Sequence, residues 1–180
     1  DRHYADPATG GYFLTASDAE GLVVRPNSTA DEATPNPNGV EAQNLVRLAC
    51  YSGQDAWRRQ ADKLFDGLMP IANENLFMHV GLLNALDLRL RAAEIVVVGS
   101  GPQAHELAAA ALKAPFLDRV VLRAPSAGAL PNLHPAQDKL KSAPGVAAYV
   151  CVGETCSLPV ASREQLSQAL ASMRPVATPG

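Results

Sequence analysis

Three groups of residues in this sequence have types and spacing that could support chemistry. The first is a glycine turn, Gly99, Gly101 and Ala104, which follows the apolar run EIVVV and has the G-x-G-x-x-A spacing of a dinucleotide-binding turn. The second is a pair of cysteines, Cys151 and Cys156, with the spacing C-x4-C. The third is a polar loop before an expected helix; its members are Asp31, Glu32, Thr34, Asn36 and Asn38.

The glycine turn has two interpretations. In a nucleotide site, Gly101 lets the backbone approach a pyrophosphate, and Arg123 at the end of the next strand meets a ribose 2′-phosphate. In the structural interpretation, glycine simply allows a tight strand-to-helix turn. We favour the second, because Pro102 removes one backbone amide that a phosphate would use, and too few strands follow for two mononucleotide-binding halves. Nucleotide binding remains the alternative.

The cysteine pair also allows two interpretations. Cys151 ends an expected strand, and α/β sites usually lie at the carboxyl ends of parallel strands, so a redox pair or half of a metal site is one hypothesis. The spacing differs from the redox motif C-x-x-C, and His134 is the one further ligand late in the chain, so we predict no metal site. The other hypothesis, which we favour, is a buried strand cysteine and a free loop cysteine. We expect their alpha carbons within about 7 Å, the limit for a disulfide.

The polar loop could line the rim of a carbohydrate-binding cavity, where carboxylates and amides hold a sugar. The alternative, which we favour, is that Asn38 caps a helix and that Asp31 and Glu32 are solvated charges. His79 lies near the apolar face of an expected helix, so a hydrogen-bonded core histidine is favoured over a catalytic base.

Composition restricts the function classes further. The chain has 180 residues, is 47% hydrophobic and 18% charged, and carries a net charge of -3, which fits a globular protein. Lys and Arg form no basic run, so we expect no nucleic-acid partner. No apolar run approaches the roughly 18 residues of a membrane span, so we expect no membrane partner. The low cysteine content favours a reducing cytoplasm, and we predict no cofactor.

The first half of the chain should position the polar loop. Residues 10–26 are rich in strand formers and predict a β-hairpin. Asn38 and Glu41 have the spacing of a capping box and predict a helix start, a second helix should end at Pro70, and a third should run over 75–90. The predicted buried positions of the third helix are Leu76, Val80, Leu83 and Leu90.

The second half should position the glycine turn and the cysteines. The pattern predicts strands over 94–98, 118–124 and 145–152, a helix over 103–113, a patternless loop over 125–144, and a last helix capped by Ser162 with Gln165. This order predicts a small, mainly parallel, three-stranded α/β module. We therefore expect two domains, residues 1–92 and 93–180, in a chain of mixed α and β class.

Four stretches, taken in order, resemble one family. GGYFLTASDAEGLVVRP, DEATPNPNGVEAQNLVRLA, EIVVVG and AYVCVGETC are similar to the C-terminal part of the YyaL-like family, which includes the spermatogenesis-associated thioredoxin-domain proteins. The resemblance implies a thioredoxin-like N-terminal domain, a six-hairpin α/α toroid of the kind shared with sugar epimerases and glycosidases, and a small α/β module at the end of the chain. Pro37 and Gly39 depart from the family pattern ATPSGNS.

The resemblance also carries an expectation about function. The chain would be a C-terminal fragment that holds the last toroid helices and the α/β module, and the fragment itself would be inactive. Its parent would be carbohydrate-active or redox-associated, with a small carbohydrate as ligand. Because the missing hairpins would leave an apolar face exposed, we expect the fragment to self-associate.

Overall fold

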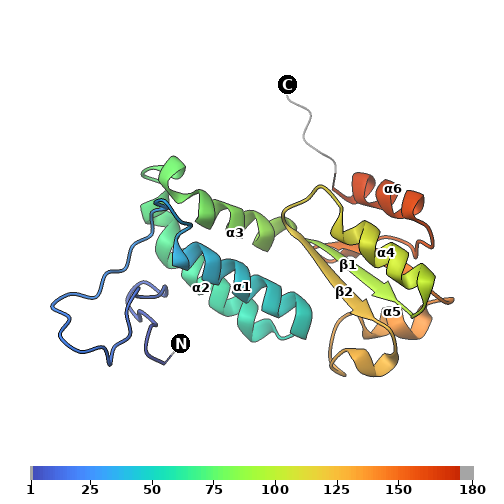
Figure 1. Ribbon diagram of the computed structural model, residues 1–180, viewed down its shortest axis with the longest axis horizontal. Helices are drawn as coiled ribbons and strands as arrows, with labels where there is room; N and C mark the ends of the chain where they lie inside the picture. Colours follow the sequence, from blue (N-terminus) through green and yellow to red (C-terminus); the bar gives the residue numbers. More distant parts are fainter. Residues whose placement is uncertain (1, 175–180) are drawn as a thin grey trace. The chain divides into compact units, whose positions relative to one another are not determined.

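The computed structural model describes residues 2–174, which fall into two compact units (Figure 1). The first unit contains residues 2–49 and 54–89, and the second contains 50–53 and 90–174. The helices and strands are α1 Pro37–Ser52, α2 Asp55–Ala72, η1 Leu76–His79, α3 Val80–Arg91, β1 Ala93–Val98, α4 Pro102–Leu112, β2 Arg119–Ala124, η2 Ala127–Ala129, α5 Gln137–Ser142, β3 Ala147–Val152, β4 Thr155–Cys156 and α6 Arg163–Met173.

The first unit is built from helices and a long N-terminal loop, and it confirms the expected helical character of this part of the chain. The starts of α1 and α3 meet at Gly39 and Gly81, where a β-carbon added to Gly39 would lie 2.8 Å from the Gly81 carbonyl carbon. At the other end of α3, Arg89 forms an ion pair with Asp62 of α2, with its Nε 2.7 Å from the carboxylate. The departure from the family pattern at Gly39 therefore has a packing reason: only glycine allows this approach.

The β-hairpin predicted over residues 10–26 is absent. This segment contains no strand. Tyr12 forms an isolated bridge with Ala5, and a single backbone hydrogen bond, from the Leu14 N–H to the Pro26 carbonyl at 2.9 Å, joins the two ends of the segment. The Asp6 N–H donates to the Gly11 carbonyl at 2.8 Å, and the Phe13 N–H donates to the Tyr4 carbonyl at 2.8 Å. A run of strand-forming residues needs a partner strand to join a sheet. Tyr12 is bridged to Ala5 on one side, and its own N–H and carbonyl bond to the Asn38 side chain of α1.

Two predictions about the helices are wrong. Helix α2 continues past Pro70 to Ala72, since a proline in the last turn removes only one helical hydrogen bond. Helix α3 buries Leu82, Ala85 and Leu88, whereas Leu76, Val80 and Leu90 of the predicted stripe are exposed. The run LLNALDLRL offers more than one apolar stripe at helical spacing, and the close approach at Gly81 selects which one faces inward.

The second unit contains a four-stranded mixed sheet with the order β2-β1-β3-β4, which corrects the predicted mainly parallel, three-stranded arrangement. Strand β1 is parallel to β2 but antiparallel to β3, and β3 is antiparallel to the short β4. Residues of β3 from Ala147 to Cys151 are buried. A continuous apolar run of this kind marks an interior strand but does not encode its direction, so the sequence could not reveal the reversal.

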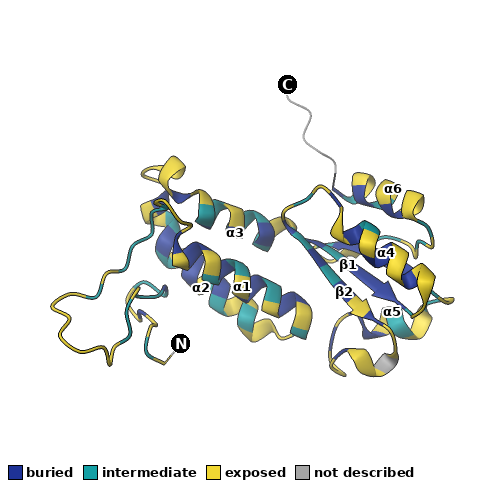
Figure 2. Cartoon of the chain, viewed as in Figure 1, coloured by how far each residue is buried: buried dark blue, intermediate teal, exposed yellow. Residues whose placement is uncertain are grey.

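Side chains alternate between the two faces of a strand, so the buried cluster shows which residues of this sheet share a face. Ile95 and Val97 of β1 and Val150 of β3 pack with Leu107 of α4 and Leu166 of α6 in one buried cluster. Figure 2 colours β1 mostly dark blue and marks buried residues on α4 and α6. Glu94 and Cys151, which are register partners, therefore lie on the opposite face. The predicted cap of α6 is confirmed, since the Ser162 side chain accepts a hydrogen bond from the Gln165 N–H.

Replacement of Gly67 in α2 by alanine should destabilise the protein. A β-carbon there would lie 1.5 Å from the Thr9 carbonyl oxygen, so the N-terminal loop would have to move off the helix. Without that clash, alanine in a helix stabilises by about 1 kcal/mol relative to glycine. We expect instead a loss of about 2 kcal/mol in the free energy of unfolding, as in other overpacked sites, measured by urea denaturation.

The matched control is Gly128→Ala, because a β-carbon at Gly128 meets no atom within 4 Å. We expect its effect to stay within about 0.5 kcal/mol. A Gly67→Ala variant that is as stable as the parent, or more stable, would show that the loop does not lie on α2.

Candidate functional site

The side chain of Asn38 fixes the N-terminal loop to the start of α1. Asn38 is 1% exposed. Its Oδ1 accepts a hydrogen bond from the Tyr12 N–H at 2.7 Å, and its Nδ2 donates to the carbonyls of Tyr12 and Ser28, each at 3.1 Å. One side-chain amide therefore replaces the neighbouring strand that Tyr12 would otherwise need. A β-carbon on Gly11 would lie 2.9 Å from this Oδ1, so the residue next to Tyr12 has to be small.

The helix cap belongs to Asn36, not to Asn38 as predicted. The Asn36 Oδ1 accepts a hydrogen bond from the Asn38 N–H at 2.8 Å, and Pro37 occupies the first helical position, where its missing N–H costs nothing. The capping-box spacing was misleading because Asn36 and Asn38 are both good capping residues. Asn38 does not cap the helix, and its side chain binds the N-terminal loop instead.

The structure brings three of the five predicted loop residues together, in a structural network. The carboxylate of Asp31 accepts from the Asn36 N–H at 2.7 Å through one oxygen and from the Gly81 N–H at 2.6 Å through the other. Asp31 thereby links the starts of α1 and α3, where a negative charge is favourable. Glu32 is exposed as predicted, and so is Thr34. The prediction that Asp31 is a solvated charge is wrong, because it is half-buried and accepts two backbone hydrogen bonds. Whether this loop contacts a sugar remains a prediction.

A second carboxylate, Asp6, organises the turn of the N-terminal loop. Its oxygens accept hydrogen bonds from the Ala8 N–H at 3.0 Å, the Thr9 hydroxyl at 2.9 Å and the Asn27 amide at 2.6 Å. Burial by itself raises the pKa of Asp6, but these hydrogen bonds stabilise the charged form and leave the pKa below its ordinary value. The turn is therefore built around a carboxylate that must stay ionised.

The loop and α1 together form a hollow that sequence reasoning missed. Its volume is about 450 Å³, and its lining residues are Tyr4, Tyr12, Phe13, Leu14, Pro37 and Glu41. Gln60 of α2 donates a hydrogen bond to the Tyr12 hydroxyl, and the Arg25 guanidinium lies 4.0 Å from the centre of the Phe13 ring. The signal in the sequence was the pair of aromatic residues at 12–13, which we assigned to a strand.

The phenol of Tyr12 lines this hollow and has a raised pKa. Burial raises the pKa of Tyr12, hydrogen bonding from Gln60 opposes the shift, and the nearby charge of Glu41 adds to it. The phenol therefore stays protonated at neutral pH. It presents to the hollow a ring and a neutral hydroxyl beside the carboxylate of Glu41, a combination of apolar surface and polar groups that suits a polyhydroxylated ligand.

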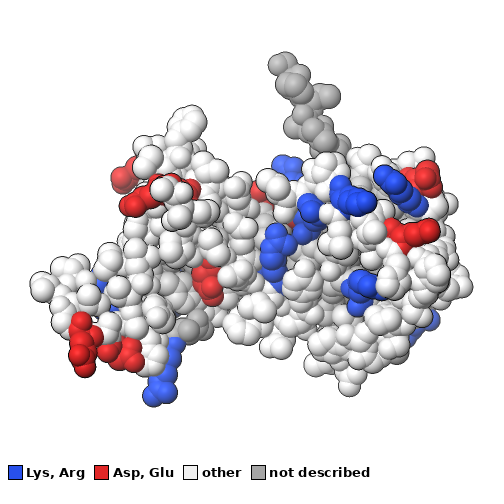
Figure 3. Space-filling model, in the orientation of Figure 1, with Lys and Arg blue, Asp and Glu red and all other residues white. Residues whose placement is uncertain are grey.

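Charged side chains of both signs lie on the second unit. Figure 3 shows Lys and Arg side chains over the second unit with Asp and Glu among them. Within residues 2–174, no group of three or more metal-binding side chains is close enough to hold an ion, and no helix is long and apolar enough to cross a membrane. Exposed apolar side chains do occur in η1, where Leu76, Phe77 and Met78 follow one another. Self-association remains a prediction.

The two buried histidines have structural partners on both ring nitrogens. In the first unit, His79 has Nδ1 2.8 Å from the Asn75 carbonyl and Nε2 3.0 Å from the Thr29 hydroxyl. In the second unit, His134 Nδ1 accepts from the Ala136 N–H at 3.0 Å, so its Nε2 carries the proton and donates to the Cys50 carbonyl at 2.8 Å. The predicted core role of His79 fits these contacts.

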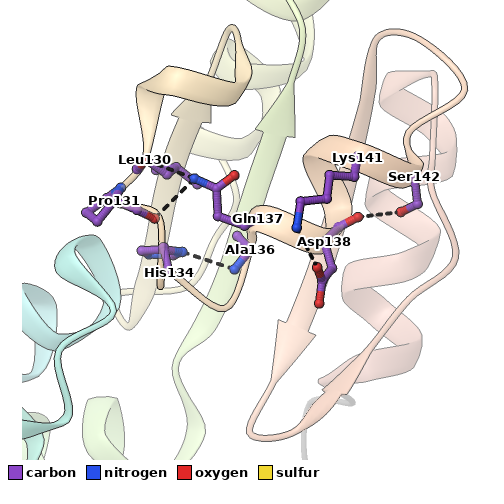
Figure 4. Close-up of polar contacts among 8 residues, drawn as sticks. All are labelled: Leu130, Pro131, His134, Ala136, Gln137, Asp138, Lys141 and Ser142. Carbon is purple, nitrogen blue, oxygen red and sulfur yellow. Dashed lines mark hydrogen bonds and ion pairs between the residues drawn. The ribbon is translucent and has the colours of Figure 1, made fainter.

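The segment predicted as a patternless loop, 125–144, is ordered by such contacts. Figure 4 shows the His134 ring directed at the backbone of α5 and the Gln137 amide directed at the preceding loop. Gln137 donates to the Leu130 carbonyl at 2.9 Å and to the Pro131 carbonyl at 3.1 Å. Buried polar side chains therefore replace the apolar periodicity that sequence reasoning looked for.

The glycine turn has the geometry of a tight strand-to-helix connection. Gly99 and Gly101 have φ angles of 94° and 92°, and a β-carbon on Gly99 would lie 2.9 Å from a Val146 methyl group. Pro102 is the first residue of α4, Ala104 is buried, and Arg123 is exposed near the end of β2. These features explain the glycines without a ligand. Nucleotide binding remains an untested alternative.

The cysteine pair is joined in a disulfide, so the favoured hypothesis of a free loop cysteine is wrong. Cys151 and Cys156 are register partners in β3 and β4, with alpha carbons 4.0 Å apart, which confirms the expected proximity. Cys151 is 6% exposed, whereas Cys156 is exposed to solvent. Because β3 runs antiparallel to β1, Cys151 lies beside the amino end of β1. The argument that placed Cys151 at the carboxyl ends of parallel strands is therefore wrong.

With this geometry in place, comparison with known proteins gives one partial similarity. Over 58 residues, the chain is 36% identical to spermatogenesis-associated protein 20 of Mus musculus. This similarity supports a relation to that family. It covers 32% of the chain and 7% of the mouse protein, so the chain spans only a small part of that relative. No protein-family model matches the chain.

Asn38→Ala should be among the most destabilising single changes in the first unit. It removes both hydrogen bonds to Tyr12 and leaves buried backbone groups without partners, at about 1 to 3 kcal/mol for each unsatisfied group. We expect a loss of about 3 kcal/mol in the free energy of unfolding, measured by urea denaturation. The control is Asn44→Ala, an exposed asparagine of α1 whose loss should change stability by less than about 0.5 kcal/mol. If both changes lowered the free energy of unfolding equally, Asn38 would not be what holds the loop on α1.

Asp6 should make the stability of the N-terminal loop depend on pH in the acid range. Because the pKa of Asp6 in the folded protein is below its ordinary value of 3.8, its contribution is fully present above pH 3.8 and is lost as the pH falls through the lower, folded value. Chemical denaturation from pH 6 to pH 2.5 measures this loss. Asp6→Asn should remove part of the acid dependence, and an unchanged pH profile in this variant would refute the assignment.

Proposed function

We propose that this chain is the C-terminal part of a YyaL-like protein, and that the hollow lined by Tyr4, Tyr12, Phe13 and Glu41 forms part of that protein's carbohydrate-binding surface. The four ordered stretches of sequence and the partial similarity to the mouse protein support the first half of the proposal. The hollow, whose lining combines three aromatic residues with one carboxylate, carries the second half.

The chemistry of the hollow favours a sugar over a purely apolar ligand. A pyranose ring has apolar C–H faces that stack on aromatic rings and hydroxyl groups that donate to a carboxylate, and Tyr12 and Glu41 offer these two kinds of contact side by side. The volume of about 450 Å³ lies within the usual range of small-molecule sites, about 300 to 1,000 Å³. We therefore assign the hollow to one or two sugar units of a neutral carbohydrate.

Preorganisation supports this assignment. The Phe13 N–H donates to the Tyr4 carbonyl at 2.8 Å, which ties together two of the aromatic residues. The amide of Asn38 fixes Tyr12 from both sides of its peptide backbone, and the Arg25 guanidinium lies against the Phe13 ring. A ligand that meets side chains already held in place loses less free energy to ordering them.

Titration of the 180-residue chain with maltose and glucose, followed by heteronuclear NMR, tests the proposal. We expect saturable shifts of the amide signals of Tyr12, Phe13 and Glu41, with a dissociation constant of the order of 1 mM, or about -4 kcal/mol. Tyr4→Ala should weaken binding roughly fivefold, since one aromatic contact contributes about 1 kcal/mol. The control is Tyr51→Ala, which removes an aromatic residue of nearly equal exposure, 47% against 46% for Tyr4, that does not line the hollow.

Two outcomes would count against the proposal. Absence of shifts at 50 mM sugar would exclude the hollow as a carbohydrate site in this chain. Shifts confined to the second unit, or equal weakening by Tyr4→Ala and Tyr51→Ala, would place binding elsewhere.

A further inference from the structure

All three cysteines of the chain lie in the second unit, around one carboxylate. Cys50, in the last part of α1, belongs to the residues 50–53 that group with the sheet. Its thiol donates a hydrogen bond to Glu94 Oε1 at 3.3 Å. Glu94 is the register partner of Cys151, which is bonded to Cys156.

The side chains of Glu94 and Cys151 lie next to each other on one face of the sheet. Register partners on adjacent antiparallel strands project to the same face, with β-carbons about 4.5 to 5.5 Å apart. The Glu94 side chain therefore has the Cys151 sulfur on one side in the sheet, and it contacts the Cys50 thiol directly. The His134 Nε2–H, which donates to the Cys50 carbonyl at 2.8 Å, holds the backbone of Cys50 in this place.

We propose that these residues form a thiol–disulfide exchange site, in which Cys50 is an internal nucleophile toward the Cys151–Cys156 bond. The carboxylate of Glu94 takes the proton from the Cys50 thiol, and the Cys50 sulfur attacks Cys151 Sγ. A Cys50–Cys151 bond forms as the Cys151–Cys156 bond breaks. The electron pair leaves on the Cys156 sulfur, which takes a proton from water, while Glu94 returns its proton to the solvent.

The step is balanced without an external oxidant, since one disulfide and one thiol are present before and after it. Its direction follows from burial. Cys151 is 6% exposed and Cys156 is exposed, so attack on Cys151 releases the thiolate at the solvated end, where its charge is not desolvated. The product carries an exposed thiol at Cys156, which is open to exchange with a small disulfide of the glutathione type. The ligand class of the site is therefore a low-molecular-weight thiol or disulfide.

Alkylation of the oxidised chain with N-ethylmaleimide at pH 8, followed by peptide mapping without reduction, tests this proposal. We expect the label on Cys156 together with a Cys50–Cys151 bond. Cys50→Ser should abolish labelling of Cys156, because no internal thiol is left to open the disulfide. Glu94→Gln should slow labelling at least about tenfold, which is a modest effect for loss of a general base, and should alter the dependence of the rate on pH.

A second variant keeps the test decisive if Cys50→Ser does not fold. In Cys156→Ser treated with oxidised glutathione, Cys50 should resolve the mixed disulfide on Cys151, which gives a Cys50–Cys151 bond and releases glutathione. A stable glutathione adduct at Cys151 would overturn the proposal. So would labelling of Cys50 with the Cys151–Cys156 bond intact in the unmodified chain.

Discussion

The first unit depends on one buried amide. The N-terminal loop contributes many backbone polar groups but no strand, and buried backbone groups without partners are costly. Asn38 solves this problem for Tyr12 because its side chain presents an acceptor and a donor to the same residue, as a neighbouring strand would. The helix can use Asn38 in this way only because Asn36 takes over the cap. The same amide fixes Tyr12, one of the residues that line the hollow.

Glycine residues at close contacts allow the N-terminal loop and the helices to approach one another. At Gly11, Gly39 and Gly67, a β-carbon would meet an atom of a neighbouring segment at 2.9 Å or less. Two of these glycines lie inside helices, where glycine is unfavourable by about 1 kcal/mol relative to alanine. At Gly67 this local cost allows the N-terminal loop to lie directly on α2, and at Gly39 it allows α1 to approach α3. The hydrogen bonds of Asn38 and the close approach at Gly67 together hold a loop that forms no β-hairpin.

Sequence reasoning worked where a local signal decides the structure, and it failed where a distant contact decides. The Ser162 cap and the buried strand at Glu94 were predictable, since capping and apolar runs act over a few residues. The inward face of α3 was not, because several stripes of leucine compete and the contact at Gly81 selects among them. The hollow could not be predicted either: it joins Tyr4 to Glu41 through the backbone of a loop that has strand composition but no strand partner.

The direction of β3 has the largest consequence for chemistry. A parallel β3 would have brought Cys151 to the same edge as the glycine turn, and the two candidate sites would have merged into one. The antiparallel strand instead pairs Cys151 with Glu94, five residues before Gly99 and so roughly 16 Å away along β1. The glycine turn is thereby left with a structural explanation that is sufficient in itself. The cysteines, in contrast, gain a carboxylate and a third thiol as neighbours, and a carboxylate that accepts the proton of a thiol is what an exchange reaction needs.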